Sequence, residues 1–316
     1  MATLMRDIWR IMHSPRPYAA VCIDDTSVQS EFLSDVVTVR KRSLPHQIAQ
    51  AFNGHEQFLN VWIYIHGSWG DGSNIAFSDF DDLIIYSENK YSDNSNERKF
   101  RAWLNKVDMR FCRLDPLQHH GHWILSQEQL LALDESYMPI KVLDGALCIR
   151  GPESVHANIC KTKTYYGIKR NLLGTVTGIE QLFSEYQDGR INLYRMKCLV
   201  GSVLLTPAYM FQINGMRVSK KWAIEHAGQV LAGESLDLLH TCELIRKTWS
   251  KALSGWRYCL FKYSPFLFMN PHAYRVFAKI FAPRFQKDLF PILRLSMVQT
   301  FLAQSKKLIE SEANVP

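Results

Sequence analysis

The sequence predicts an α+β fold, in which a small mixed sheet flanked by helices is followed by an all-helical part. Two apolar segments, 60–66 and 79–86, have the length and composition of buried strands. Beyond about residue 156, apolar residues recur at helical spacing with few strand signals. We therefore expect two domains, residues 1–155 and residues 156–316.

Composition describes an ordinary folded protein, because 47% of the 316 residues are hydrophobic and 21% are charged. The seven cysteines are scattered, with no CxxC pair, which favours reduced thiols and a cytoplasmic location. No signal peptide is recognisable, and the longest apolar run, 198–213, is interrupted by Pro207 and Gln212 and is too short to span a membrane. We therefore expect no membrane partner.

The net charge of +7 suits an anionic partner such as a nucleotide or RNA. The positive charge is the only feature that supports an RNA partner. An ordinary basic enzyme would account for this charge equally well. The acceptor of any reaction is not indicated by the sequence.

In the first half, the order of elements follows from periodicity and turn residues. Apolar residues recur at helical spacing in three segments, the last of which ends before Pro116, and four further segments have the pattern of strands. Ser126 and Gln129 form the pattern of a capping box, which predicts that another helix begins there. The expected helices are 27–39, 45–52 and 100–114; the expected strands are 60–66, 79–86, 118–125 and 147–150; residues 1–25 look irregular.

In the second half, helix boundaries are marked by turn and capping residues. A long helix over 165–186 ends at Asp188-Gly189, and a second over 193–213 ends at Gly215. Ser219 and Ser235 are expected to cap helices that end near residues 231 and 249. A final helix is expected over 285–311.

The second predicted strand opens with Asp79 and Asp81. Strand side chains alternate between faces, so these two carboxylates project the same way. Two adjacent negative charges repel unless a cation lies between them, and oxygen ligands favour a hard ion such as Mg²⁺. The preceding strand ends at Gly67-Ser68, where a glycine turn lets backbone N–H groups approach a phosphate. These features predict a site for a metal-bound nucleoside triphosphate.

Gly67-Ser68, the loop after it, and Ser78-Asp79-Phe80-Asp81 resemble the signature of the DNA-polymerase-beta-like nucleotidyltransferase superfamily. The resemblance covers roughly residues 55 to 90. It implies a metal-dependent nucleotidyltransferase that moves a nucleoside monophosphate from an NTP to an acceptor. Asp79 and Asp81 would hold one or two Mg²⁺ ions, and Gly67, Ser68 and Ser78 would bind the nucleotide.

The second half loosely resembles the helical domain of antibiotic-modifying nucleotidyltransferases. The shared feature is a helix, a glycine turn, and Gly215 to Lys220 (GMRVSK) opening another helix. The acceptor stays open between a small molecule, a protein side chain and an RNA end.

The superfamily usually supplies a third carboxylate from a neighbouring strand, and this chain departs from that pattern. The segment expected to be that strand carries His119, His120 and His122, with His120 and His122 on one face. Either of these two histidines could serve as metal ligand or general base, or Asp115 could fold back into the site. A zinc site of the His-x-His type and purely structural histidines are further readings. If the third position is lost, the chain is a weak or inactive nucleotide-binding module.

Overall fold

The computed structural model describes residues 32–38, 46–58, 60–87 and 94–310. About 60% of these residues are helical and 13% are in strands, which confirms the α+β class in its coarse form. The segment expected to be irregular, 1–25, lies outside the described residues.

The central sheet has four strands in the order β4-β3-β2-β5, with β3 and β4 parallel and the other neighbours antiparallel. It is therefore the small mixed sheet that was predicted. Its strands are β2 (Trp62–His66), β3 (Asp81–Tyr86), β4 (Trp123–Ser126) and β5 (Leu147–Arg150). Each begins or ends within a few residues of its prediction, but β3 opens at Asp81 and β4 at Trp123.

A separate antiparallel pair joins β1 (Phe32–Thr38) to β6 (Ser154–Cys160). The helix expected over 27–39 is therefore wrong where the chain is described. The β-branched pair Val36-Val37 favours a strand, and pairing with a partner more than a hundred residues away overrides the local helical spacing.

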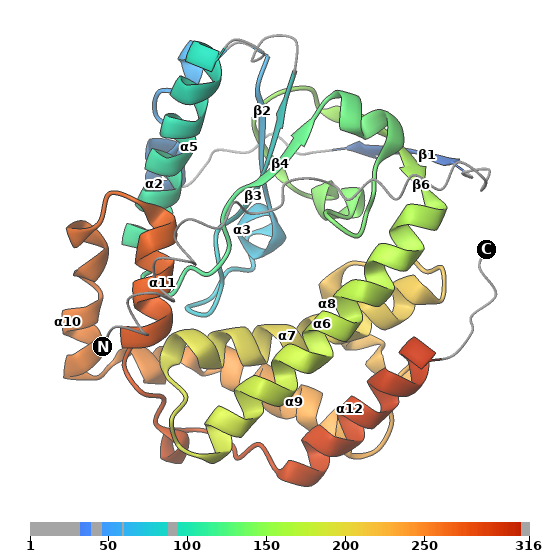
Figure 1. The fold of residues 1–316 in the computed structure, drawn as a ribbon, viewed down its shortest axis with the longest axis vertical. Coiled ribbons are helices and arrows are strands. Elements are labelled where there is room, and N and C mark those ends of the chain that lie inside the picture. Colours follow the sequence, from blue (N-terminus) through green and yellow to red (C-terminus); the bar gives the residue numbers. More distant parts are fainter. Residues whose placement is uncertain (1–31, 39–45, 59, 88–93, 311–316) are drawn as a thin grey trace.

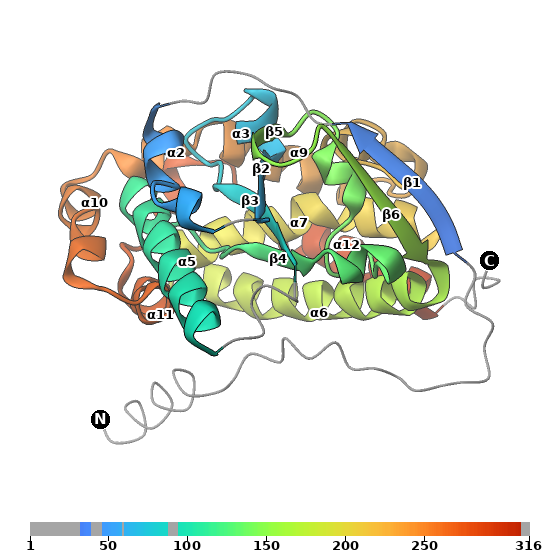
Figure 2. The ribbon, with the colours of Figure 1, turned by 90° about the horizontal axis from the view of Figure 1, so that it is seen from above.

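Side chains alternate between the two faces of the sheet, and each face has its own apolar core. Figure 2 shows two helices lying on one side of β2 and β3. Ile63 and Ile84 face α2 (His46–Ala51) and α5 (Asn94–Leu114). Tyr64 and Leu83 face the opposite side, where the 3₁₀ helices η2 (Glu128–Ala132) and η3 (Ile140–Leu143) cover the sheet. Ser126 and Gln129 exchange the two hydrogen bonds of the predicted capping box, and this box opens η2.

The helical part starts at Lys161 and packs below the sheet in Figure 1. The strand β6 runs across residue 155, and the division into two domains stays a prediction. The helices are α6 (Lys161–Gln187), α7 (Leu193–Ile213), α8 (Lys220–Glu225), α9 (Glu234–Lys247), α10 (Trp256–Phe261), α11 (Pro271–Phe281) and α12 (Leu295–Glu310). Short 3₁₀ turns complete the described chain: η1 (His55–Gln57), η4 (Ala227–Gln229), η5 (Trp249–Leu253), η6 (Ser264–Leu267) and η7 (Lys287–Leu289).

Most predicted helix boundaries hold. The bounds of α7 are those predicted, Asp188 forms the C-cap of α6, and Ser219 accepts the backbone N–H of Trp222 at the start of α8. Several differ. Gly233 rather than Ser235 precedes α9, and α12 begins ten residues later than residue 285. The helix α8 ends at Glu225 rather than near residue 231, and α5 begins at Asn94 rather than at residue 100.

The helix α7 is long and apolar enough to cross a membrane, which the interrupted apolar run at 198–213 did not indicate. However, 67% of its most apolar window is buried inside the fold. It packs most closely against α6, as expected of the core helix of a folded protein. The cytoplasmic location stays a prediction.

Candidate functional site

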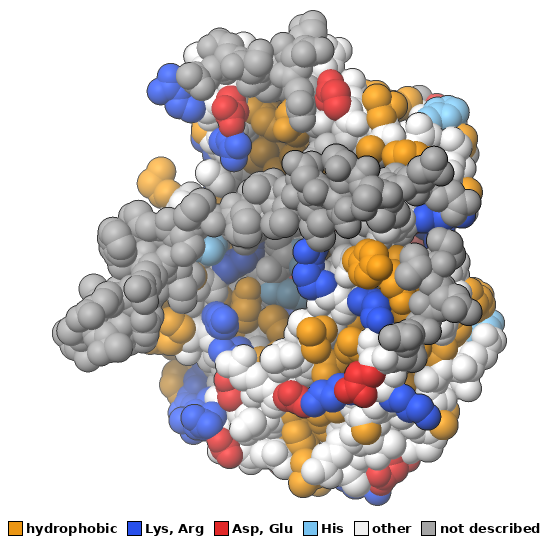
Figure 3. Space-filling model, turned by 45° about the vertical axis from the view of Figure 1, so that its right-hand side comes forward, with side chains coloured by type: hydrophobic (Ala, Val, Ile, Leu, Met, Phe, Trp, Pro, Cys, Tyr) orange, Lys and Arg blue, Asp and Glu red, His pale blue; other side chains and the backbone are white. Residues whose placement is uncertain are grey.

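A cavity of about 2390 Å³ lies between the sheet and the helical part. One end is lined by the residues around the predicted phosphate turn and the Asp pair, and the opposite wall by α6, α8 and α9. That helical wall carries six Lys and Arg side chains and two Glu side chains, so its net charge is +4: Lys163, Arg170, Lys220, Lys221, Arg246 and Lys247, with Glu225 and Glu243. Figure 3 shows Lys and Arg side chains gathered around a hollow in the surface.

The glycine turn after β2 forms the start of a short helix, α3 (Gly67–Asp71). Gly67 adopts φ +63°, the left-handed region that favours glycine. A Cβ atom at this position would lie 3.1 Å from Asp81 Oδ2. Gly70 is equally constrained, since a Cβ there would lie 2.7 Å from the carbonyl oxygen of Ile65. The chain therefore brings Asp81 directly against the backbone of Gly67.

Asp79 and Asp81 both line this end of the cavity, although only Asp81 belongs to β3. Burial raises the pKa of Asp81 to about 7, and the neighbouring Asp79 carboxylate adds to this effect. The two carboxylates therefore share one end of the cavity. A cation between them would remove this cost, so the pair fits a divalent ion.

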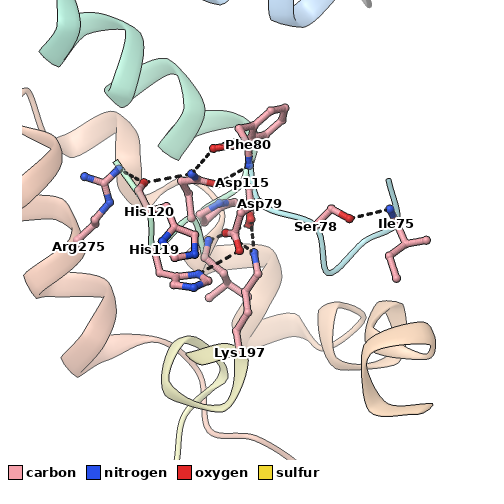
Figure 4. A network of polar contacts seen from close by, with 12 residues as sticks. Ile75, Ser78, Asp79, Phe80, Asp115, His119, His120, Lys197 and Arg275 are labelled. Atoms are coloured by element: carbon pink, nitrogen blue, oxygen red, sulfur yellow. Dashed lines mark hydrogen bonds and ion pairs between the residues drawn. The ribbon is translucent and has the colours of Figure 1, made fainter. Parts of the chain in front are cut away.

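Asp79 already has a built-in cation beside it. Lys197 on α7 is fully buried, and its Nζ donates hydrogen bonds of 2.9 Å to Asp79 Oδ1 and 2.6 Å to Asp115 Oδ2 (Figure 4). Burial alone would raise the pKa of Asp79, but His119 and Lys197 lower it well below its usual range. Burial acts to lower the pKa of Lys197, yet Asp115 and Asp79 raise it above its ordinary value. Asp79 is therefore ionised and Lys197 protonated at neutral pH.

The three histidines do not lie on a strand, because β4 begins only at Trp123. The alternation expected over 118–125 is therefore wrong. His119 and His120 both lie beside Asp79 in the lining of the cavity (Figure 4). The centroids of the two imidazole rings are 3.9 Å apart. One ligand atom from each of these histidines and one Asp79 oxygen lie within 4.8 Å of one another.

His122, predicted as a catalytic residue beside His120, points elsewhere. Its Nδ1 lies 2.6 Å from Asp82 Oδ2 and its Nε2 lies 2.9 Å from the carbonyl oxygen of Leu104. Burial opposes protonation, but Asp82 raises the pKa of His122 to about 9. His122 is absent from the cavity lining, so it belongs to a buried ion pair rather than to the site. The predicted pairing of His120 with His122 is wrong.

Two residues that sequence reasoning did not identify hold the histidine segment in place. The side-chain amide of Gln118 accepts from the backbone N–H of Phe80 and donates to its carbonyl oxygen, both at 2.9 Å. It also donates to the carbonyl oxygen of His120 at 3.1 Å. Arg275 on α11 donates to the same carbonyl and pairs with buried Asp108. Side chains thus replace the missing strand pairing and fix the segment beside Asp79.

The remaining predicted residues occupy the cavity wall. Ser68 lies in α3, and Ser78 closes a turn by accepting from the backbone N–H of Ile75 at 3.0 Å. His66 is buried beside them, and burial lowers its pKa to about 4. Its Nε2 atom has no hydrogen-bond partner among the described residues. Such an unsatisfied buried atom at the edge of the Asp pair is consistent with a site made for a polar ligand.

One signal in the sequence indicates the role of Lys197. A lysine inside the otherwise apolar helix 193–213 cannot be buried without a carboxylate partner. The signal does not name the partner, which lies 118 residues away at Asp79.

No protein-family model matches this chain, and no curated protein or solved structure is significantly similar to it.

Proposed function

We propose that this chain is a metal-dependent nucleotidyltransferase that moves a nucleoside monophosphate from an NTP to an acceptor hydroxyl. The observation that carries the proposal is the juxtaposition of Asp79, Asp81 and Gly67 at one end of a cavity. Two repelling carboxylates beside a left-handed glycine fit a metal-bound triphosphate better than they fit a purely structural role.

Asp79 and Asp81 would hold Mg²⁺, which neutralises charge on the transferred phosphorus and on the leaving pyrophosphate when it is bound. The backbone of Gly67 and the hydroxyl of Ser68 would bind the terminal phosphates. His119 and Lys197 together keep Asp79 ionised and oriented, because the Lys197 ammonium donates to Oδ1 while Oδ2 lies 3.1 Å from His119 Nδ1.

The bond changes follow from this arrangement. An acceptor oxygen forms a bond to the α-phosphorus while the bond from that phosphorus to pyrophosphate breaks. The acceptor proton leaves in the same step. His120 faces the cavity, and burial followed by the neighbouring His119 lowers its pKa well below the ordinary value, so its imidazole is neutral at pH 7. It can therefore accept this proton or bind a metal.

The positive helical wall supports the same proposal. A triphosphate with one Mg²⁺ keeps a net negative charge, and Lys220 on α8 acts electrostatically on both Asp79 and Asp81 from across the cavity. Ordinary ligand pockets have volumes of about 300–1,000 Å³, so this cavity is far larger than one nucleotide requires. It therefore leaves room for an acceptor, which could be a small molecule, a protein side chain or an RNA end.

The test measures nucleotide transfer and pyrophosphate release from labelled triphosphates with Mg²⁺. Asp79→Asn and Asp81→Asn should each lower the rate by about 100-fold or more, since each removes a charge from the metal site. Asp144→Asn is the matched control, because Asp144 lines the same cavity but pairs with Lys141. Equal rates in all four proteins would refute the assignment.

A second candidate is a nucleotide-binding module of the same fold that has lost catalysis. Lys197 favours it, because its ammonium engages both Asp79 and Asp115, the nearest candidate for a third carboxylate. Calorimetry separates the two functions. Mg²⁺-dependent triphosphate binding without turnover on small-molecule, protein or RNA acceptors would support the module.

A further inference from the structure

The cluster around Asp79 contains nitrogen ligands that a magnesium site does not need. His119, His120 and Asp79 each contribute one ligand atom, and these three atoms lie within 4.8 Å of one another. Imidazole nitrogen suits zinc-type ions, whereas Mg²⁺ prefers oxygen ligands. We propose that Asp79, His119 and His120 form a second metal site, which takes a zinc-type divalent ion and shares Asp79 with the proposed Mg²⁺ site.

The state of His119 supports this site. Its Nδ1 is buried and forms an ion-pair contact of 3.1 Å with Asp79 Oδ2, but it makes no well-oriented hydrogen bond to any described residue. The ring centroids of His119 and His120 are 3.9 Å apart, so both imidazoles can reach one ion. A metal ion shared with Asp79 would give the Nδ1 atom of His119 a well-oriented partner.

The surrounding hydrogen bonds hold the three ligands in fixed positions, as the partners of metal ligands do in metal proteins. Lys197 binds Asp79 Oδ1, so Oδ2 is the oxygen that faces the histidines. The carbonyl oxygen of His120 is held by both Arg275 and Gln118. The site is thus assembled before any ion arrives.

The ligand set also indicates the kind of site. Two histidines and one carboxylate leave a zinc-type ion one open coordination position, which is the pattern of catalytic rather than structural zinc sites. All three ligands line the cavity, so this position would face the acceptor region. Metal binding does not depend on the proposed function, but a role in activating the acceptor hydroxyl rests on it.

The experiment titrates the metal-free protein with Zn²⁺ by calorimetry and with Co²⁺ by visible absorption, in the presence and absence of excess Mg²⁺. We expect one Zn²⁺ per chain, a Co²⁺ spectrum typical of low coordination, and little competition from Mg²⁺. His119→Ala and His120→Ala should each weaken binding by 10-fold or more and change the Co²⁺ spectrum. His240→Ala, at an exposed position on α9, is the matched control.

Circular dichroism establishes that each variant is folded, and Asp79→Asn provides a second route to losing the site without removing a histidine. Unchanged Zn²⁺ affinity in His119→Ala, His120→Ala and Asp79→Asn would overturn the site, as would the absence of Zn²⁺ binding to the wild type. Zinc binding without nucleotide transfer would uphold the site and refute the proposed function. Mg²⁺-dependent nucleotide transfer without zinc binding would refute the zinc site and uphold the proposed function.

Discussion

The ammonium of Lys197 donates a hydrogen bond of 2.9 Å to Asp79, and this contact joins the helical part to the sheet. Lys197 lies on the core helix α7, whereas Asp79 immediately precedes the sheet strand β3. Because Asp115 accepts a second hydrogen bond from the same ammonium, one fully buried charge ties α7 both to Asp79 before β3 and to the residue that follows α5.

Replacing Lys197 tests how much of the fold depends on this contact. Lys197→Met should lower the free energy of unfolding by about 3–5 kcal/mol, because it leaves buried carboxylates without their cation. Urea unfolding followed by circular dichroism measures the change.

The double variant Lys197→Met with Asp115→Asn should be more stable than the single variant, since it removes one of the orphaned charges. Lys247→Met is the control, because Lys247 pairs with Glu243 on the exposed surface of α9 and should contribute less than about 1 kcal/mol. Similar losses from Lys197→Met and Lys247→Met would contradict the role assigned to Lys197.

Much of the frame that carries the site was predictable because it depends on local pattern. The apolar runs of β2 and β3, the long apolar helix α7, and the capping box at Ser126 all follow from the spacing and chemistry of neighbouring residues. The same patterns located Asp81 against Gly67, because a strand, a tight turn and a second antiparallel strand bring them together.

The rest depends on contacts between distant residues, which local pattern does not carry. Alternation wrongly paired His120 with His122 because the segment before Trp123 is shaped by the side chain of Gln118 rather than by strand pairing. The expected helix over 27–39 failed for the same reason, since its partner strand β6 follows much later in the chain.

A substitution at Gly67 tests the phosphate turn. Gly67→Ala should destabilise the fold by about 1–2 kcal/mol through its left-handed backbone, and it should also displace Asp81, whose Oδ2 would lie 3.1 Å from the new Cβ. We expect Mg²⁺-dependent triphosphate affinity, measured by calorimetry, to fall by at least 10-fold.

Gly72→Ala separates backbone strain from the contact with Asp81. Gly72 also has a positive φ, +81°, but a Cβ there meets nothing within 4 Å. The two variants should therefore lose similar stability while only Gly67→Ala loses triphosphate affinity. An equal loss of affinity in both would argue against a specific role for Gly67.

The buried pair of His122 and Asp82 predicts a pH-dependent contribution to stability. Burial opposes protonation, but Asp82 raises the pKa of His122 to about 9, from about 6.5 in an unfolded chain. A raised folded pKa stabilises the fold fully below pH 6.5, and this contribution disappears as the pH rises through 9.

The shift corresponds to about 3 kcal/mol. His122→Asn should therefore reduce the free energy of unfolding relative to wild type strongly at pH 6, and by about 3 kcal/mol less at pH 10. Chemical unfolding at both pH values measures this difference, with the exposed His240→Asn as control. A His122→Asn penalty that is the same at pH 6 and pH 10 would show that His122 is not protonated in the fold.

The positive wall of the cavity predicts a specific defect in nucleotide binding. Lys220 on α8 is exposed to the cavity and interacts electrostatically with Asp79 and Asp81, so its ammonium would attract the phosphates bound there. Lys220→Ala should weaken triphosphate binding by about 5- to 20-fold, by analogy with 1–2 kcal/mol for a charge-assisted hydrogen bond, and leave stability within about 0.5 kcal/mol of wild type.

Lys262→Ala is the matched control, because Lys262 on the far surface lies over the ring of Tyr263 and outside the cavity lining. Calorimetry at two salt concentrations makes the test sharper, since loss of an ionic contact should also reduce the salt dependence of binding. If the Lys220 and Lys262 variants bind triphosphate alike, the helical wall contributes nothing to nucleotide recognition and the phosphates must be held by the sheet side alone.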